Sequence, residues 1–195
     1  GGYVKRVCKP ANIDNYHVTV DYNDNIVTIT MDMQSRSANV INEEFGKLWL
    51  ETLDRLEKEK ADIAGVVLTS AKSTFFAGAD IDNLYKQTNP QEIFDMCEGL
   101  KKQLRRIETL GKPVVAALNG AALGGGLEIA LACHARVVSN DKSTKLALPE
   151  VKLGLLPGGG GTQRLPRLVG LQAALDMMLT GKNVFANPAL KLGLV

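Results

Sequence analysis

The sequence predicts a domain of the α/β class, and three observations support this prediction. Short apolar segments typical of buried strands alternate with longer segments that have the period of amphipathic helices. The predicted order of elements, β-β-α-β-α-β-α-β, is typical of strands joined by right-handed helical crossovers. The composition, 45% apolar and 23% charged over 195 residues, is ordinary for one globular domain or slightly more.

The first predicted elements are a β-hairpin over residues 17–32 and a helix over 41–56. β-Branched residues dominate the hairpin strands, and the Asn-Asp-Asn sequence at 23–25 supplies the turn. Apolar side chains recur on one face of the helix, whose expected cap is Asn39 or Asn42. The remaining predicted elements are a strand at 64–70, a glycine-containing turn at 75–81, a helix at 93–107, a strand at 114–120, a helix at 127–133, a strand at 135–139, a Gly- and Pro-rich segment at 145–170 with one short strand and one helix, and helices at 171–181 and 187–194.

Charge and cysteine content exclude several classes of function. The net charge of +2, with acids and bases interspersed, gives no electrostatic reason to expect a nucleic acid or an anionic membrane surface as partner. No apolar run approaches the ~20 residues that cross a bilayer. Cys8, Cys97 and Cys133 have unrelated spacings, which fit neither a disulfide framework nor a zinc site. We therefore expect a protein of a reducing, intracellular compartment.

The glycine cluster Gly124-Gly125-Gly126 precedes a predicted helix and matches neither the P-loop nor the dinucleotide-binding fingerprint. Its backbone amides lie at the positive end of the helix dipole, where they can hold a phosphate or a developing oxyanion. Glu128 follows within the first turn, and an acid there repels phosphate but suits an uncharged carbonyl that needs a base. The alternative is a tight turn followed by a helix with one solvated Glu.

Glu150 lies in an apolar, turn-rich segment 22 residues after Glu128. Two carboxylates that face one pocket can divide the roles of acid and base when their surroundings separate their pKa values. Burial among Leu148, Val151 and Leu153 would raise the pKa of Glu150. The alternatives for Glu150 are an exposed side chain or a helix cap.

Three motifs occur in a fixed order along the chain. They are F-x-A-G-A-D-I at 75–81, N-G-x-x-x-G-G-G-x-E at 119–128, and P-E-x-x-x-G-x-x-P-G-x-G-G-T-Q-R-L at 149–165. The amides of the first motif are candidates for the second half of an oxyanion hole. In this order and at these separations the motifs resemble the enoyl-CoA hydratase/isomerase (crotonase) family from about residue 17 to the end of the chain. The residues of these motifs are most similar to those of the N-terminal hydratase domain of multifunctional fatty acid oxidation proteins. The dehydrogenase domain of those proteins is not part of this sequence.

The resemblance implies a fold and a domain organisation. The fold is expected to be crotonase-like, a spiral of ββα units of the ClpP/crotonase type, formed by residues 17–195. Residues 1–16 are expected to be an N-terminal extension or residues added by cloning. The C-terminal helices of the family are expected to lie beyond residue 195, so that this segment alone is expected to show weak or no turnover compared with a longer chain.

The resemblance also implies a reaction. The backbone N–H groups of Ala79 and Gly125 would hold the thioester oxygen of a trans-2-enoyl-CoA. Glu128 would help activate a water for attack at C3, and Glu150 would deliver a proton to C2, so that syn addition yields a 3-hydroxyacyl-CoA. Isomerisation through Glu150 alone, another reaction of a CoA thioester, and a non-catalytic binding module remain as alternatives.

Further residues are implied to contact the substrate, with coenzyme A bound as part of the substrate and no cofactor or metal required. Arg36 is a candidate partner of the CoA phosphates, and helix 91–107 is a candidate wall of the acyl tunnel or ordinary core. The implied partner is a thiolase subunit, or further copies of the chain, in the bacterial cytoplasm. The implied substrate-binding residues are Ala77, Gly78, Asp80, Ile81, Gly124, Pro157 and Gly158.

Five residues with functional side chains are expected to have structural roles. Asp80 is expected to cap the short helix after Gly78. Gln163 and Arg164 are expected to fix the loop that carries Glu150. Cys133 and His134, as neighbours on a helix, point ~100° apart and are not expected to act together.

Overall fold

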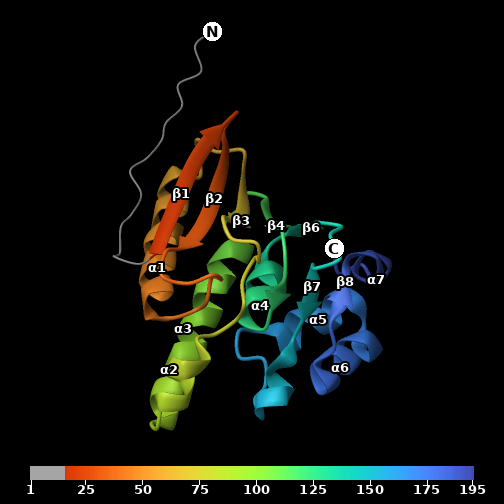
Figure 1. Cartoon of the computed structure of the whole chain (residues 1–195). Coiled ribbons are helices and arrows are strands. Elements are labelled where there is room, and N and C mark those ends of the chain that lie inside the picture. The colour runs from red at the N-terminus through yellow and green to blue at the C-terminus, as the bar shows by residue number, and fades with distance from the viewer. Residues whose placement is uncertain (1–15) are drawn as a thin grey trace.

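A computed structural model of the chain describes residues 16–195 and is built on a five-stranded sheet (Figure 1). The strand order is β1-β2-β3-β4-β6; β1 and β2 are antiparallel, and the other neighbours are parallel. The α/β class predicted from the sequence is confirmed, and residues 1–15 of the predicted extension lie outside the described part. The strands are β1 Tyr16–Asn23, β2 Ile26–Met33, β3 Gly65–Ser70, β4 Val114–Leu118 and β6 Ala135–Val138.

The predicted hairpin is formed by β1 and β2. Asp24 and Asn25 have φ angles of 50° and 62°, the left-handed conformation that a two-residue hairpin turn requires. Asn and Asp tolerate this conformation better than most residues. Register follows from the turn, because Asn23 pairs with Ile26 and each later pair is set in sequence.

Three helices lie next to the sheet: α1 Glu43–Glu59, α3 Pro90–Glu108 and α4 Gly125–Ala132. Helix α1 contacts β1 and α3, and α3 contacts α4, so the three form a continuous layer (Figure 1). The Oδ1 atom of Asn42 accepts the N–H of Phe45 at 2.9 Å, which identifies the cap of α1 as Asn42. The predicted apolar face of α1 is buried, whereas in α3 the side chains of Leu104 and Ile107 alone are fully buried.

Beyond the main sheet, the chain forms a second, smaller sheet of three short strands and a cluster of short helices. Strands β5 and β8 have two residues each, too few for a periodic pattern, and were not predicted. Within residues 16–195, no helix combines the length and hydropathy that a membrane span requires. The elements are β5 Ala122–Leu123, β7 Lys145–Ala147, β8 Val184–Phe185, the 3₁₀ helix η1 Pro149–Leu153, and helices α5 Gly161–Val169, α6 Leu171–Thr180 and α7 Ala186–Lys191.

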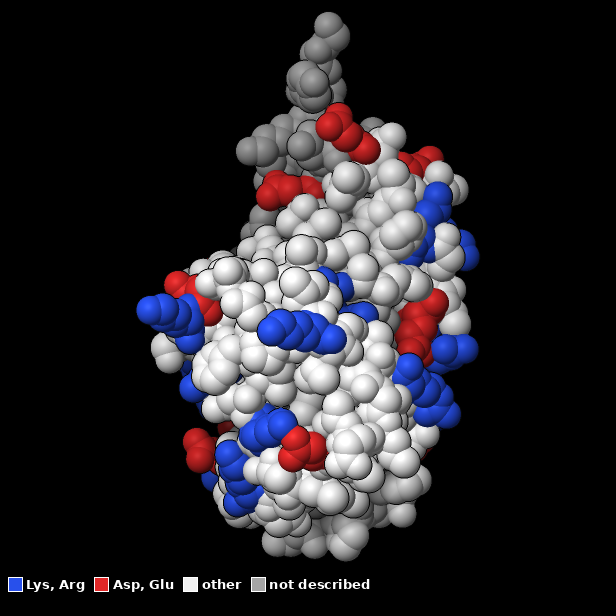
Figure 2. Space-filling model, turned by 90° about the vertical axis from the view of Figure 1, so that its right-hand side faces the viewer, with Lys and Arg blue, Asp and Glu red and all other residues white. Residues whose placement is uncertain are grey.

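Helices α6 and α7 end the chain on one side of the molecule, and several of their apolar side chains are exposed. Leu171, Leu179 and Leu190 each expose about two thirds of their surface, at 64%, 66% and 66%. Figure 2, viewed from the side on which α7 lies in Figure 1, shows a face made mostly of uncharged residues.

Candidate active site

Two glycine-containing segments that are far apart in the sequence lie side by side. Residues 75–80 and 121–125 are joined by a parallel bridge between Phe76 and Ala122. The N–H of Leu123 donates to the carbonyl oxygen of Phe76 at 3.0 Å. A Cβ atom at Gly78 would lie 3.8 Å from the nitrogen of Gly125. The structure thus brings together the two turns that the sequence proposes for one oxyanion hole.

The backbone of residues 77–80 directs the N–H of Ala79 away from residues 39–41, the segment to which residues 77–80 are hydrogen-bonded. Ala77 donates its N–H to the carbonyl oxygen of Asn39 at 2.9 Å, and a regular strand would point the N–H of Ala79 the same way. Gly78, at φ 100°, interrupts this alternation. Beyond it, the Gly78 carbonyl accepts the N–H of Ile41 at 2.8 Å and Asp80 donates to the Ile41 carbonyl at 3.0 Å. In such a parallel bridge the N–H of Ala79 faces the opposite side, where residues 121–125 lie.

Asn39 fixes this segment to the end of the main sheet, a role that the sequence did not indicate. Its side chain is completely buried, and its Oδ1 atom accepts the N–H of Met33 at 2.9 Å. Its Nδ2 atom donates to the carbonyl oxygen of Met31 at 3.1 Å, to Oγ of Ser70 at 2.8 Å and to the carbonyl oxygen of Phe75 at 3.3 Å. Asn39 therefore ties two strand ends to the segment that carries Ala79, and it does not cap α1.

Close packing explains the glycines at the start of α4. A Cβ atom at Gly126 would lie 2.5 Å from Cβ and 2.6 Å from the carbonyl oxygen of Phe76, closer than any real contact. A Cβ atom at Gly124, which has φ 54°, would lie 3.0 Å from Oε1 of Glu150. The helix begins at Gly125, two residues before the predicted start, so the N–H of Gly125 lies in its first turn.

Glu128 lies in the first turn of α4 and is 2% exposed. Its Oε1 atom accepts two backbone N–H groups, from Gly159 and from Gly161, each at 2.8 Å. Burial raises the pKa of this carboxyl above its ordinary value, and the two N–H donors and the charge of Arg164 partly oppose that rise. The carboxylate is thus oriented through one oxygen by the glycine-rich segment that precedes α5.

Glu150 lies in the first turn of η1, half-buried, and its surroundings differ from those of Glu128. Its Oε2 atom is buried without a hydrogen-bond partner among residues 16–195. Burial raises the pKa of Glu150 to about 7, and the nearby charge of Glu128 adds to the rise. The predicted apolar surroundings are wrong in part. Leu148 is fully buried, but Val151 and Leu153 are 39% and 41% exposed because η1 turns them outward.

The predicted substrate-binding residues are divided between buried and exposed positions. Asp80 caps α2 (Ile81–Lys86), as predicted, by accepting the N–H of Asn83 at 3.4 Å, and it forms an ion pair with Arg36 at 2.8 Å. This pair holds Arg36 beside the 77–81 turn. A Cβ atom at Gly158 would lie 3.0 Å from Sγ of Cys97, so that α3 borders the glycine-rich segment. Ala77 and Ile81 are exposed, whereas Gly78, Gly124 and Pro157 are buried.

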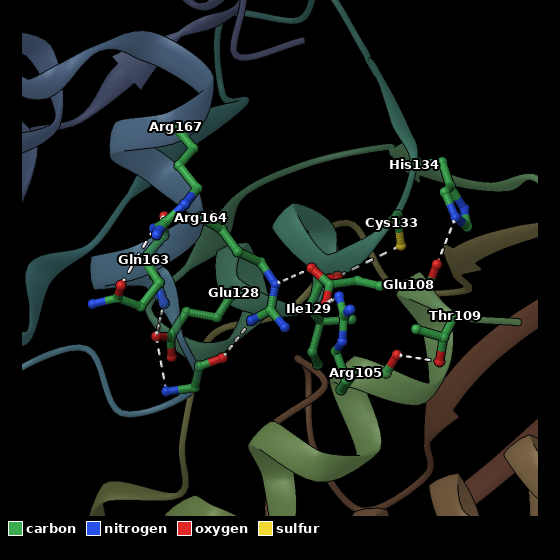
Figure 3. A network of polar contacts seen from close by, with 12 residues as sticks. Arg105, Glu108, Thr109, Glu128, Ile129, Cys133, His134, Gln163, Arg164 and Arg167 are labelled. Atoms are coloured by element: carbon green, nitrogen blue, oxygen red, sulfur yellow. Dashed lines mark hydrogen bonds and ion pairs between the residues drawn. The ribbon is translucent and has the colours of Figure 1, made fainter.

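Arg164 supports a different loop from the one predicted (Figure 3). Its Nη1 atom donates to the carbonyl oxygen of Gly159 at 3.0 Å, so it contacts the segment that binds Glu128 and not the loop of Glu150. The reason is that Arg164 lies only four residues beyond Gly160, the residue before α5. The spacing in the sequence indicates that Arg164 lies near the glycine turn, but it does not indicate whether that turn contacts Glu128 or Glu150.

Cys133 and His134 make structural contacts. The N–H of Val114 donates to Nδ1 of His134 at 3.0 Å, and Sγ of Cys133 contacts the carbonyl oxygen of Ile129 at 3.5 Å. The two residues are not both helical, because α4 ends at Ala132. In the described part of the chain, no group of His, Cys, Asp or Glu side chains is arranged to hold a metal ion.

The chain is similar to a known family and to known proteins. The family model described as enoyl-CoA hydratase/isomerase matches residues 21–195. The fatty acid oxidation complex subunit alpha of Shewanella frigidimarina is 51% identical over 173 residues, which are 88% of this chain and 24% of that protein. The subunit of the same name from Shewanella loihica is 51% identical over 171 residues, with 87% and 24% covered. The chain thus spans about a quarter of the length of these curated relatives.

Several solved structures share the fold of this chain. An enoyl-CoA hydratase from Bacillus anthracis superposes with a TM-score of 0.84 at 36% identity, covering 91% of this chain and 68% of that one. An enoyl-CoA hydratase from Thermoplasma volcanium superposes with a TM-score of 0.84 at 31% identity, covering 91% and 69%. The two turns and two carboxylates described above therefore lie in a scaffold shared with these proteins.

Proposed function

Because the chain belongs to the enoyl-CoA hydratase/isomerase family, with the crotonase-like fold expected from the sequence, we propose that it adds water to trans-2-enoyl-CoA thioesters. The observation that carries the proposal is the pair of carboxylates, Glu128 and Glu150, beside two adjoining glycine turns. One carboxylate is held by two amides, and the other has a pKa raised to about 7. Such a pair is suited to base and acid roles at the same pH.

In the proposed reaction the N–H groups of Ala79 and Gly125 hold the thioester oxygen. They polarise the conjugated double bond and stabilise the enolate charge that develops on that oxygen. The absence of side chains at Gly78 and Gly124 allows a flat carbonyl group to approach both turns. Loss of one such donor typically costs ~2.7–4 kcal/mol of barrier stabilisation.

The two carboxylates then act on one water molecule. Glu128, whose ionised form is supported by the amides of Gly159 and Gly161, accepts a proton from water as the oxygen attacks C3. Glu150, protonated near neutral pH, gives its proton to C2. Both groups act from the same side of the double bond, which gives syn addition and a 3-hydroxyacyl-CoA.

Substrate and partners belong to the same proposal. The relatives named as subunits of a fatty acid oxidation complex support a role in fatty acid β-oxidation, with coenzyme A bound as part of the substrate and no separate cofactor. Among the proposed substrate contacts, Gly124 lies beside Glu150, and the 77–81 turn adjoins Gly125 through Gly78. Pro157 and Gly158 directly precede the turn that binds Glu128. The exposed apolar residues of α6 and α7 support oligomerisation; a thiolase partner and a cytoplasmic location rest on the family resemblance.

Isomerisation of a trans-3-enoyl-CoA is a second candidate activity. It requires one group that removes a proton at C2 and returns it at C4. The unpartnered Oε2 atom of Glu150 and the raised pKa of this residue favour such a proton carrier. A non-catalytic binding module is less favoured, because binding alone does not require that Glu128 and Glu150 lie in such different surroundings.

The test is to incubate the full chain separately with trans-2-enoyl-CoA and trans-3-enoyl-CoA and to follow product mass and double-bond absorbance. We expect the first substrate to gain the mass of one water. Conversion of the second to a conjugated enoyl-CoA of the same mass, or to the 3-hydroxyacyl-CoA that forms from it, would establish isomerisation. Glu51→Gln, an exposed change on α1, is the matched control and should leave both rates unchanged. Failure to convert either substrate, in this chain and in a longer chain that includes the C-terminal helices of the family, would overturn the proposal in favour of a binding module.

A further inference from the structure

The turn formed by Gly159, Gly160 and Gly161 is held between a carboxylate and a guanidinium. A Cβ atom at Gly159 would lie 2.7 Å from Oε2 of Glu128, and one at Gly161 would lie 3.0 Å from Oε1. A Cβ atom at Gly160 would lie 2.3 Å from Nη1 of Arg164. A side chain at Gly159 or Gly160 would therefore displace Glu128 or Arg164, and one at Gly161 would crowd Glu128. The backbone of the turn is the direct link between the two charged groups.

Arg164 is itself fixed at the end of α3 (Figure 3). Its Nε atom donates to Oε1 of Glu108 at 2.7 Å, and its side chain is 16% exposed. Arg105 donates to the other carboxylate oxygen of Glu108 at 2.8 Å, and the ring of His134 contacts the Glu108 carbonyl at 3.1 Å. A mostly buried ion pair with this support holds its geometry better than an exposed pair does.

From this geometry we propose that Arg164 is a positioning residue for Glu128. By holding the carbonyl of Gly159, it keeps the N–H groups of Gly159 and Gly161 directed at Oε1 of Glu128. Arg164 does not touch the reacting atoms and acts only through the turn. The inference rests on the proposed function, since it assigns Arg164 to the orientation and ionisation of the base in that reaction.

Loss of the guanidinium should affect Glu128 in two ways. The turn would lose the hydrogen bond that fixes the carbonyl of Gly159. The turn has no side chains to replace this bond, and Gly160 has a positive φ angle. The charge of Arg164 also lowers the pKa of Glu128. The other titratable groups that face Glu128 are Glu150 from η1 and Cys97 from α3, and neither supplies a positive charge. Both effects make Glu128 harder to ionise.

The experiment compares three variants of the full chain: Arg164→Met, Arg164→Lys and Arg167→Met. Arg167 is the matched control, because it lies one turn further along α5 and donates to Gln163 rather than to the glycine turn. Two readouts are measured. One is the pH dependence of kcat with an enoyl-CoA substrate, and the other is amide hydrogen exchange in the segment 158–161.

We expect Arg164→Met to lower kcat about 10- to 100-fold with little change in KM, since it removes part of the contribution of a positioned base. The acidic limb of its profile should move to higher pH, and exchange in segment 158–161 should be about tenfold faster or more. Arg164→Lys should recover part of each effect, because its ammonium can donate to the same carbonyl. Arg167→Met should match the wild type in both readouts.

Hydrogen exchange separates failure of this inference from failure of the proposed function. If the wild type is inactive, both as this chain and as a longer chain with the C-terminal helices of the family, but Arg164→Met still loosens segment 158–161, the proposed function is wrong and the positioning role stands. Unchanged exchange in Arg164→Met overturns the inference, whatever the activity. An equal loss of kcat in Arg167→Met, or an acidic limb that does not move in Arg164→Met, also overturns it. Should Arg164→Met fail to fold, Glu108→Gln, which weakens the hold on Arg164, is measured in the same way.

Discussion

Glu128 contributes to the raised pKa of Glu150, although the two carboxylates lie on different elements and are held differently. Glu128 accepts two backbone N–H groups on one oxygen, whereas Glu150 buries an oxygen that has no partner in the described part of the chain. Mutual repulsion and unequal hydrogen bonding favour a state with one charged and one protonated carboxyl group. This state is the one that the proposed addition of water uses.

The first prediction concerns pH dependence. The pKa of Glu150 is raised to about 7, and the protonated form is the proposed acid. The rate constant kcat/KM should therefore fall as the pH rises through this value, since the free enzyme loses the required proton. The measurement is initial rates of enoyl-CoA hydration between about pH 5 and about pH 9. A rate that keeps rising across that range would contradict the assignment of Glu150 as the acid.

The second prediction concerns stability. The pKa of Glu150 in the folded state, about 7, lies above its ordinary value of 4.5. The stability that the protonated form contributes is therefore fully present below pH 4.5 and is lost as the pH rises through 7. Glu150→Gln removes that loss. At about pH 8 the variant should unfold about 2–6 °C above the wild type, and at about pH 4 the two should agree. Calorimetry at both pH values tests this, and the same difference at each would refute it.

The third prediction concerns the glycine at the start of α4. Gly126→Ala should destabilise the fold by about 1–3 kcal/mol or more, because the added Cβ meets the backbone of Phe76. Gly46→Ala, within α1, has no atom within 4 Å of the new Cβ and should stabilise by about 0.5–1 kcal/mol. Denaturant unfolding of the two variants provides the comparison. Equal effects would show that close packing is not what requires glycine at Gly126.

The fourth prediction concerns Asn39. Asn39→Asp keeps the shape of the side chain but removes the donor that serves three buried acceptors, and it introduces a buried acid. We expect a loss of about 2–4 kcal/mol in the free energy of unfolding. Asn42→Asp is the control and should be nearly neutral, since Asp caps a helix as well as Asn does. The idea fails if the two substitutions are equally tolerated.

Much of the fold could be predicted from the sequence, because it depends on periodicity and on local turn chemistry. The hairpin with Asp24 and Asn25, the apolar face of α1 and the buried strand β3 each have a local pattern. Strands β5 and β8 do not, because two residues form strands there only through partners elsewhere in the chain. The exposed positions of Val151 and Leu153 likewise depend on the direction of η1 and not on their own hydrophobicity.

The candidate site was predictable as a set of residues but not as an arrangement. The motifs identify Glu128, Glu150 and the two turns, yet the direction of the Ala79 N–H depends on hydrogen bonds to residues 39–41. The partner of the Gly159–Gly161 turn depends on how α5 lies against α4. Such relationships between distant segments have no signature in the spacing of a single sequence.

The most direct test of the central claim is the rate of enoyl-CoA hydration in Glu128→Gln and Glu150→Gln, measured as loss of the enoyl-thioester absorbance of crotonyl-CoA. Each change keeps the shape of the side chain and removes proton transfer. We predict that each lowers kcat by about 10²- to 10⁴-fold, while Glu51→Gln behaves as the wild type. A double variant little slower than either single variant would fit two groups acting on one water. If Glu150→Gln hydrates crotonyl-CoA at the wild-type rate, the proposed mechanism is wrong.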